Sequence, residues 1–201
     1  MAKQEVIDYW QQQWPKAVAT QELEDHSQSI PNDFLQVITS PREVLTVIKN
    51  AKTIIDFGSG TGHLCHVLSL LGWNTVSGIE ISEYIVDYAN KKYGNGRVSF
   101  KLEESINDCD LIVTSNTLEH FHDPYKLIED FLIHCKHLII LVPYKGGRLS
   151  DTPSGGAGHV YRFDIKEFND YDVLELFVFR TRGWTEGENP LQLCVLLKGK
   201  L

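Results

Sequence analysis

Short apolar runs alternate with amphipathic stretches along most of the chain. The runs are bounded by polar or turn residues, and their length and composition are typical of β-strands. Five such strands are predicted, at Thr53 to Phe57, Thr75 to Ile79, Val98 to Lys101, Leu111 to Thr114 and His137 to Val142. Strands and helices that take turns predict right-handed crossovers and a parallel sheet covered on both faces.

Four helices are predicted from apolar residues spaced three and four positions apart and from the residues at the helix starts. They run from Pro41 to Asn50, from His63 to Leu71, from Glu83 to Tyr93 and from Tyr125 to Cys135. Ser82 precedes the third helix as a predicted N-cap, and Asp123-Pro124 precedes the fourth.

The alternation ends after Val142. Two long β-type runs follow, Asp172 to Arg180 and Leu191 to Lys198, and only the turn-rich link Gly183 to Pro190 separates them, which indicates a hairpin. The predicted fold class is therefore α/β, with a doubly wound, mostly parallel seven-stranded sheet that ends in a C-terminal antiparallel hairpin.

At 201 residues the chain has the length of one domain, so residues 1–201 are predicted to share one core. Residues 1–39, which include Tyr9, Trp10 and Trp14, are predicted to be an N-terminal lid or appendage. Residues 146–158 are rich in Gly, Ser and Pro and are predicted to be a flexible loop. A loop of this length is either a lid that substrate orders or a plain disordered link.

Composition narrows the classes of function. The net charge of −8 gives no broad positive field for nucleic acid, so a nucleic-acid partner is not expected, although a local basic patch stays open. No apolar run has the length of a membrane span, and the N-terminus lacks the profile of a signal peptide, so a cytoplasmic protein is predicted. The four cysteines are scattered singly and are predicted to be reduced core residues.

A glycine-rich loop, Asp56-Phe57-Gly58-Ser59-Gly60-Thr61-Gly62, joins the first predicted strand to the helix that begins at His63. Glycines let a ligand approach the backbone, and the following helix start offers free N–H groups. The dinucleotide fingerprint G-x-G-x-x-G would need its third glycine at His63, and a phosphate loop would need Lys there. Glu80 ends the next strand, beside this loop, where it can bind ribose hydroxyls.

Together, Ile55 to Gly62 and Ile79-Glu80-Ile81-Ser82 resemble the class I S-adenosylmethionine-dependent methyltransferases, over about Thr53 to Tyr144. The resemblance implies a Rossmann-like methyltransferase fold and S-adenosylmethionine as the cofactor. It also implies that the methionine part is held by Asp56 and the backbone of Gly58, Ser59, Gly60 and Gly62, the ribose by Glu80 and the adenine by Ile81. Glu103, in preference to Glu104, is predicted near the adenine amino group.

The segment Leu111 to Pro124 resembles the "LEH..DP" segment of the same family, and it brings Asn116, Glu119 and His120 to the carboxyl edge of the sheet, beside the methyl donor. Because the sulfonium already activates the methyl group, an enzyme must mainly align the acceptor and remove its proton. His120 is the predicted base, since imidazole titrates near neutral pH. The alternative is that Glu119-His120 only caps the turn.

A metal site is a second possibility for the same residues. Ubiquinone-pathway O-methyltransferases and small-RNA 2'-O-methyltransferases carry a Glu three residues before their Glu-His pair, and these groups contribute to a metal site. This chain has Asn116 there, which is a poorer ligand. His159 lies where the small-RNA enzymes supply another His, so it joins Glu119 and His120 as a catalytic candidate and as a partial ligand set. No metal is predicted.

The predicted function is transfer of a methyl group to a hydroxyl or amine of a small-molecule acceptor. Neither the Asn/Asp-Pro-Pro-Tyr motif of adenine-methylating enzymes nor a Pro-Cys nucleophile for cytosine is present. Two alternatives stay open. A nicotinamide-dependent oxidoreductase is opposed by the glycine spacing and by the hairpin, and a methyltransferase-like binding module without catalysis would fit the same cofactor motifs. The acceptor, the methylated atom and the oligomeric state are not predicted.

Overall fold

The computed structural model describes residues 8–13, 15, 34, 36–37, 42–70, 72, 75–103, 105–145, 159–181 and 191–201. The predicted flexible loop at residues 146–158 lies outside the described residues, as does most of the predicted N-terminal lid or appendage.

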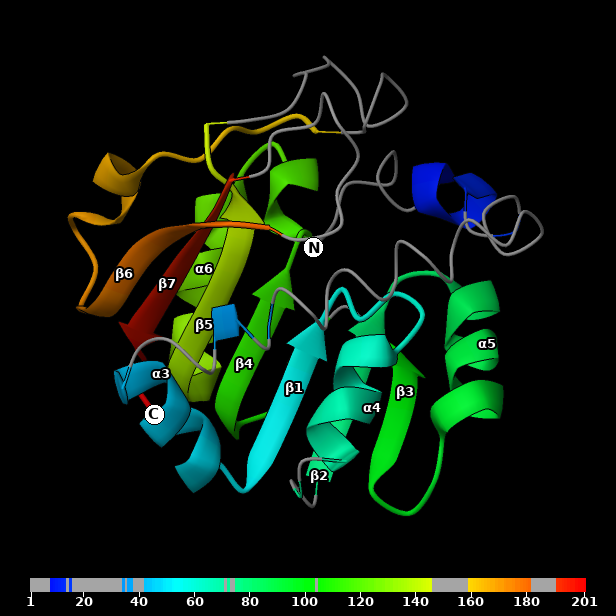
Figure 1. Cartoon of the computed structure of the whole chain (residues 1–201). Coiled ribbons are helices and arrows are strands. Elements are labelled where there is room, and N and C mark those ends of the chain that lie inside the picture. Colours follow the sequence, from blue (N-terminus) through cyan, green and yellow to red (C-terminus); the bar gives the residue numbers. More distant parts are fainter. Residues whose placement is uncertain are drawn as a thin grey trace.

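Seven strands form one sheet in the order β3-β2-β1-β4-β5-β7-β6 (Figure 1). Their bounds are Thr53–Phe57 (β1), Thr75–Glu80 (β2), Val98–Leu102 (β3), Cys109–Ser115 (β4), Cys135–Pro143 (β5), Val173–Arg180 (β6) and Leu191–Lys198 (β7). Strands β1 to β5 are parallel to one another, and β7 runs antiparallel between β5 and β6. The predicted mostly parallel sheet and its antiparallel C-terminal hairpin are confirmed.

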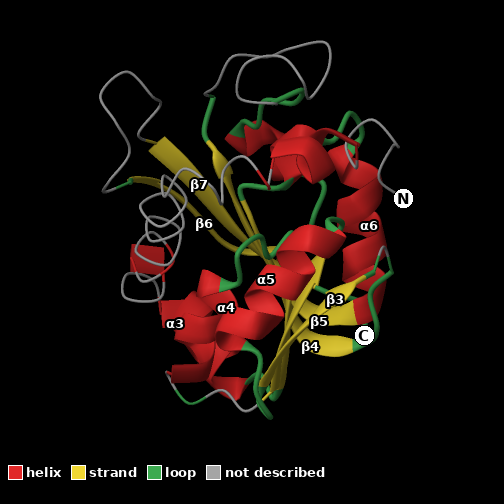
Figure 2. Cartoon of the chain, turned by 90° about the vertical axis from the view of Figure 1, so that its right-hand side faces the viewer, coloured by secondary structure: helices red, strands yellow, loops and turns green. Residues whose placement is uncertain are grey.

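The four predicted helices are present as α3 (Arg42–Asn50), α4 (His63–Leu70), α5 (Glu83–Tyr93) and α6 (Pro124–His134). Figure 2 shows α3, α4 and α5 on one face of the sheet and α6 on the other. Two 3₁₀ helices, η1 (Leu118–His120) and η2 (Ile165–Phe168), were not predicted. Ser82 is the N-cap of α5 as predicted, although its side chain makes no capping hydrogen bond. None of the described helices is long and apolar enough to cross a bilayer.

Both faces of the sheet are covered, which explains why the central strands are apolar at successive positions. Ile54 of β1 packs with α3 and α4, while its neighbours Ile55 and Phe57 pack with α6. The four cysteines are buried and free, as predicted.

The order of strands creates one point where the chain reverses direction across the sheet. From β1 the chain moves outward through β2 to β3, and it then returns to form β4 on the other side of β1. In doubly wound sheets ligands bind at the carboxyl ends of the two strands that flank such a point. The loops after β1, β2 and β4 meet at this edge, which is the upper edge in Figure 1.

At the opposite edge, the carboxylate of Asp110 joins three strands. Its Oδ2 accepts hydrogen bonds from the backbone N–H groups of Lys52 (2.8 Å) and Thr53 (3.1 Å), and its Oδ1 lies 2.7 Å from Lys136 Nζ. The hydrogen bond from Lys136 is the largest cause that lowers the pKa of Asp110 to about 2. The ionised carboxylate therefore holds the start of β1 to β4 and β5.

We predict that Asp110→Ala lowers the free energy of unfolding by about 2 kcal/mol, because it removes hydrogen bonds to a charged group. The depressed pKa means that this contribution is present above the ordinary pKa of 3.8 and is lost as the pH falls toward 2. Urea unfolding at pH 7 and pH 3 measures both effects. Asp108→Ala is the control, because its pair with His134 is exposed and such pairs contribute less than about 1 kcal/mol.

Candidate functional site

The glycine loop after β1 packs closely against β3 and against the segment that follows β4. Gly58, Gly60 and Gly62 all have positive φ, at 75°, 50° and 85°. A Cβ on Gly58 would lie 2.3 Å from Thr117 Oγ1, and one on Gly62 would lie 2.4 Å from the ring of Phe100. Only glycine combines this conformation with this close approach. The contact with Thr117 places the loop beside the residues that follow β4.

Glu80 ties the glycine loop to β2. Its Oε2 accepts a hydrogen bond from the backbone N–H of Gly60 (3.0 Å), and its Oε1 accepts from those of Ile81 (2.8 Å) and Ser82 (3.3 Å). Burial raises the pKa of Glu80, and the three hydrogen bonds oppose that rise. A carboxylate has about four acceptor sites, so one remains for a ligand.

Asp56 lies under the loop, at the end of β1, and is 2% exposed. It accepts a hydrogen bond from the thiol of Cys65 in α4 (3.5 Å). Burial raises the pKa of Asp56 to about 7, and the negative charge of Glu80 adds to the rise. The carboxyl group thus connects β1 to α4 beneath the loop.

The other predicted cofactor residues lie around the same edge. Ser59 is buried, and its Oγ has no hydrogen-bond partner among the described residues. Ile81 is half-buried and packs against the core on the α6 face. Glu103 is partly exposed and lies 3.9 Å from Lys101 Nζ, while Glu104 lies outside the described residues. Asn116 follows β4 with a φ of 50° and donates its backbone N–H to Leu141 (2.9 Å).

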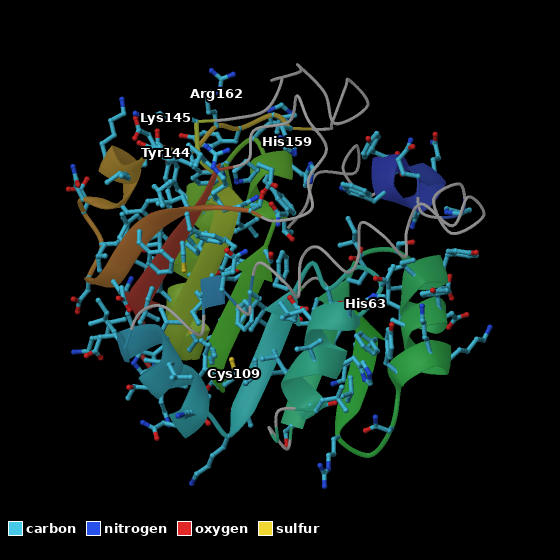
Figure 3. All side chains as sticks on the ribbon, viewed as in Figure 1. His63, Cys109, Tyr144, Lys145, His159 and Arg162 are labelled. Atoms are coloured by element: carbon cyan, nitrogen blue, oxygen red, sulfur yellow. The ribbon has the colours of Figure 1, made fainter. Side chains whose placement is uncertain are left out.

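The three predicted catalytic residues lie together although His159 is far along the chain. The backbone N–H groups of Val160 (2.8 Å) and Tyr161 (3.0 Å) both donate to the carbonyl oxygen of Glu119. These hydrogen bonds dock the segment that carries His159 onto η1. As a result His159 Nε2 lies 3.8 Å from Glu119 Oε1, and the His120 and His159 ring centroids are 5.1 Å apart. Figure 3 shows His159 at the carboxyl edge of the sheet, opposite Cys109.

The carboxyl group of Glu119 is buried, and few interactions offset the free-energy cost of removing it from water. Glu119 is 1% exposed, and neither of its carboxyl oxygens accepts a hydrogen bond from any described residue. Burial raises its pKa to about 8. Burial therefore favours the neutral carboxylic acid form of Glu119.

Comparison with protein families identifies the chain. Residues 15–169 match the family model described as a methyltransferase domain, which is more than half of the chain. The chain belongs to the class I S-adenosylmethionine-dependent methyltransferases. S-adenosylmethionine is accordingly its cofactor. A search of curated proteins gives no match.

Solved structures share the fold of this methyltransferase at low identity. A methyltransferase from Anabaena variabilis has a TM-score of 0.68 at 14% identity and covers 99% of this chain and 97% of its own. Magnesium protoporphyrin IX methyltransferase from Synechocystis has a TM-score of 0.60 at 17% identity. The match covers 88% of this chain and 80% of the Synechocystis chain. The N-terminal domain of EvdMO1 has a TM-score of 0.60 at 16% identity, and the match covers 85% of this chain and 83% of that domain. It was crystallised in the presence of S-adenosylhomocysteine and D-fucose.

Three further residues contact the predicted site residues, and the sequence analysis assigned them no contacts. Trp10, in the N-terminal segment, packs edge-to-face on His120 with ring centroids 5.0 Å apart. His63 lies 3.1 Å from Thr61 Oγ1 and 2.7 Å from Tyr93 OH, which joins the glycine loop to α5.

Gln192 of β7 is the third such residue, and it donates its side-chain N–H to Asn116 (2.8 Å). A single polar residue within the otherwise apolar run from Leu191 to Leu197 was the signal in the sequence that could have identified it.

The methyltransferase could hold a metal ion at one place among its described residues. Single ligand atoms of Glu119, His120 and His159 all lie within 4.8 Å of one another. A carboxylate and two imidazoles are a suitable three-ligand set for a divalent transition metal. The side-chain oxygen of Asn116 accepts a hydrogen bond from Gln192, so one of its two lone pairs is already engaged.

We predict that Glu119→Gln stabilises the methyltransferase increasingly as the pH rises from the ordinary pKa of 4.5 to about 8. In that range the unfolded chain loses the proton that the buried carboxyl keeps, so wild-type stability falls by at most about 1.4 kcal/mol per pH unit relative to the variant. Thermal unfolding between pH 4 and pH 9 measures the difference. Glu129→Gln, at an exposed position on α6, is the control, and a pH-independent difference for Glu119→Gln would contradict the interpretation.

Proposed function

We propose that this methyltransferase methylates a hydroxyl or amine group of a small molecule, with His120 as the base. The observation that carries the proposal is the contact of Gly58 with Thr117. This contact brings the donor-binding loop beside the segment that leads directly into Glu119 and His120. A methyl group held at the loop would then face the ionisable residues.

We propose that the donor lies along the edge formed by the loops after β1, β2 and β4. The backbone of Gly58, Gly60 and Gly62, with Ser59, would hold the methionine part, and Asp56 would act from below by fixing the loop. The remaining acceptor site of Glu80 would bind the ribose. Ile81 would cover the adenine, Glu103 would lie near its amino group, and Asn116 would lie beside the methionine part.

In the proposed reaction the acceptor oxygen or nitrogen attacks the methyl carbon, and the carbon–sulfur bond breaks with its electron pair passing to sulfur. The acceptor proton passes to His120. Trp10 packs on one side of the His120 ring and His159 lies on another, which fixes the imidazole. Glu119 would lie beside the base, with its Oε1 3.8 Å from His159 Nε2.

Several observations favour a small acceptor over a nucleic acid. The protein has a net charge of −8, and Trp10 covers part of the proposed base. A nucleic-acid strand needs a basic surface to bind its phosphates. The similar Synechocystis enzyme is named for a porphyrin, and the EvdMO1 domain was crystallised with a sugar present, so this fold accommodates small molecules.

We propose that catalysis needs no metal. A divalent ion at Glu119, His120 and His159 would lower the pKa of an acceptor hydroxyl. The side-chain oxygen of Asn116 already accepts a hydrogen bond from Gln192, and this favours the metal-free group. Elemental analysis of the purified protein distinguishes the metal-free group from the metal-bound one. One equivalent of bound metal that is lost in His159→Ala would contradict the metal-free proposal.

We predict that calorimetry detects binding of S-adenosylhomocysteine and no binding of NADH. Glu80→Ala should weaken S-adenosylhomocysteine about 10-fold or more, because it removes a charged hydrogen bond to the ribose and frees the Gly60 backbone. Glu83→Ala, an exposed change at the start of α5, is the control. Binding of NADH alone would refute the donor assignment, and an unchanged affinity for Glu80→Ala would refute the ribose role.

We predict that His120→Ala lowers turnover about 100-fold or more at neutral pH, the usual contribution of a general base. The assay is release of S-adenosylhomocysteine over a panel of hydroxyl and amine compounds. His122→Ala, two residues away and exposed, is the control. Full turnover by His120→Ala would remove His120 as the base, and no turnover by the wild type with any acceptor would favour a binding module.

A further inference from the structure

Gln192 occupies an unusual position for a polar side chain. The antiparallel strand β7 begins at the carboxyl edge of the sheet, where Gln192 pairs with Pro143 of β5 and Phe179 of β6. It is 1% exposed, and the other buried positions of β7 hold aliphatic side chains and one cysteine. An amide is costly to bury, so its hydrogen bonds must explain why it is there.

The Gln192 amide has a defined orientation. The Asn116 side-chain nitrogen donates to Ser115 Oγ (3.3 Å), so the Asn116 side-chain oxygen faces Gln192. Gln192 Nε2 donates to that oxygen at 2.8 Å. Gln192 Oε1 therefore points elsewhere, and it accepts no hydrogen bond from any residue that the structure describes. A buried carbonyl oxygen of this kind is a site for a hydrogen-bond donor.

The position of Asn116 indicates which ligand supplies that donor. Asn116 directly precedes Thr117, the residue that Gly58 contacts. The Asn116–Gln192 pair therefore lies next to the loop proposed to hold the methionine part. The oxygen and nitrogen of an amide share one carbon, so Gln192 Oε1 lies within about 5 Å of the Asn116 side-chain oxygen. The methionine part carries an α-ammonium group with three N–H donors. Hydrogen bonds from a charged donor are about twice as strong as neutral ones.

We propose that Gln192 binds the methyl donor by accepting a hydrogen bond at Oε1 from the α-ammonium group of the methionine part. Asn116 holds the amide in place for this contact. The assignment rests on the proposed function, and it adds a residue from the C-terminal hairpin to the donor site. A hydroxyl or amine of the acceptor is the competing source of the donor group.

Two adenosine ligands distinguish a hydrogen bond from the α-ammonium group from one that the acceptor donates. S-adenosylhomocysteine carries the amino acid part, whereas 5'-methylthioadenosine has the same adenosine and sulfur and lacks it. We predict that Gln192→Met, which keeps the volume and removes the amide, weakens S-adenosylhomocysteine about 10-fold or more. The affinity for 5'-methylthioadenosine should change less than about 2-fold, because that ligand has no ammonium group. Calorimetry on the full chain measures both.

Thr181→Val is the matched control. Thr181 also carries a buried oxygen without a partner among the described residues, but it follows β6, one strand farther from Asn116. Removal of the Thr181 hydroxyl should leave the affinities for S-adenosylhomocysteine and 5'-methylthioadenosine within about 2-fold of wild type. Should Gln192→Met fail to fold, Gln192→Asn, whose amide is withdrawn by one methylene, gives the same comparison.

An unchanged affinity of Gln192→Met for S-adenosylhomocysteine overturns the proposal and leaves the acceptor as the source of the donor group. An equal loss for both ligands also overturns it, because Gln192 would then act on the structure of the site as a whole. If the wild type binds neither ligand, the donor assignment under the proposed function fails instead.

Discussion

The site depends on the contact between the backbone of Gly58 and the side chain of Thr117. It exists because β1 and β4 are neighbours in the sheet although two other strands separate them along the chain. Any side chain at position 58 would push the two loops apart. With glycine there, the glycine loop lies beside the segment with Glu119 and His120. The hydrogen bonds of Glu119 with residues 160 and 161 bring His159 to the same place.

Three buried carboxyl groups give this edge of the sheet its electrostatic character, and each has different partners. Glu80 accepts three backbone hydrogen bonds, Asp56 accepts one from a thiol, and Glu119 accepts none from the described residues. Burial raises the pKa of all three. A cationic methyl donor beside these groups would favour their ionised forms, since an opposite charge nearby favours the charged form. Donor binding would therefore be coupled to proton release at this edge of the sheet.

The fold could be predicted from the sequence because its signals are local. Apolar runs between turn residues gave all seven strands, and spaced apolar residues gave the four helices. The 3₁₀ helices were not predicted, because three or four residues carry too little periodicity. The glycine loop and Glu80 were likewise identified from spacing within short segments.

The contacts of the site could be predicted only in part. His159 was placed near Glu119 through family resemblance, since the backbone hydrogen bonds that hold it there leave no trace in side-chain identity. Gln192 and Trp10 join the site from the two ends of the chain, and only tertiary structure brings them to Asn116 and His120.

A crystal structure with S-adenosylhomocysteine would test the proposed position of the donor. It should show the amino acid part between the loop at Gly58 and Asn116, and the sulfur within about 7 Å of a His120 ring nitrogen, the span of a methyl, an acceptor atom and a hydrogen bond. A ligand bound at another edge of the sheet, or one whose sulfur faces away from His120, would contradict it.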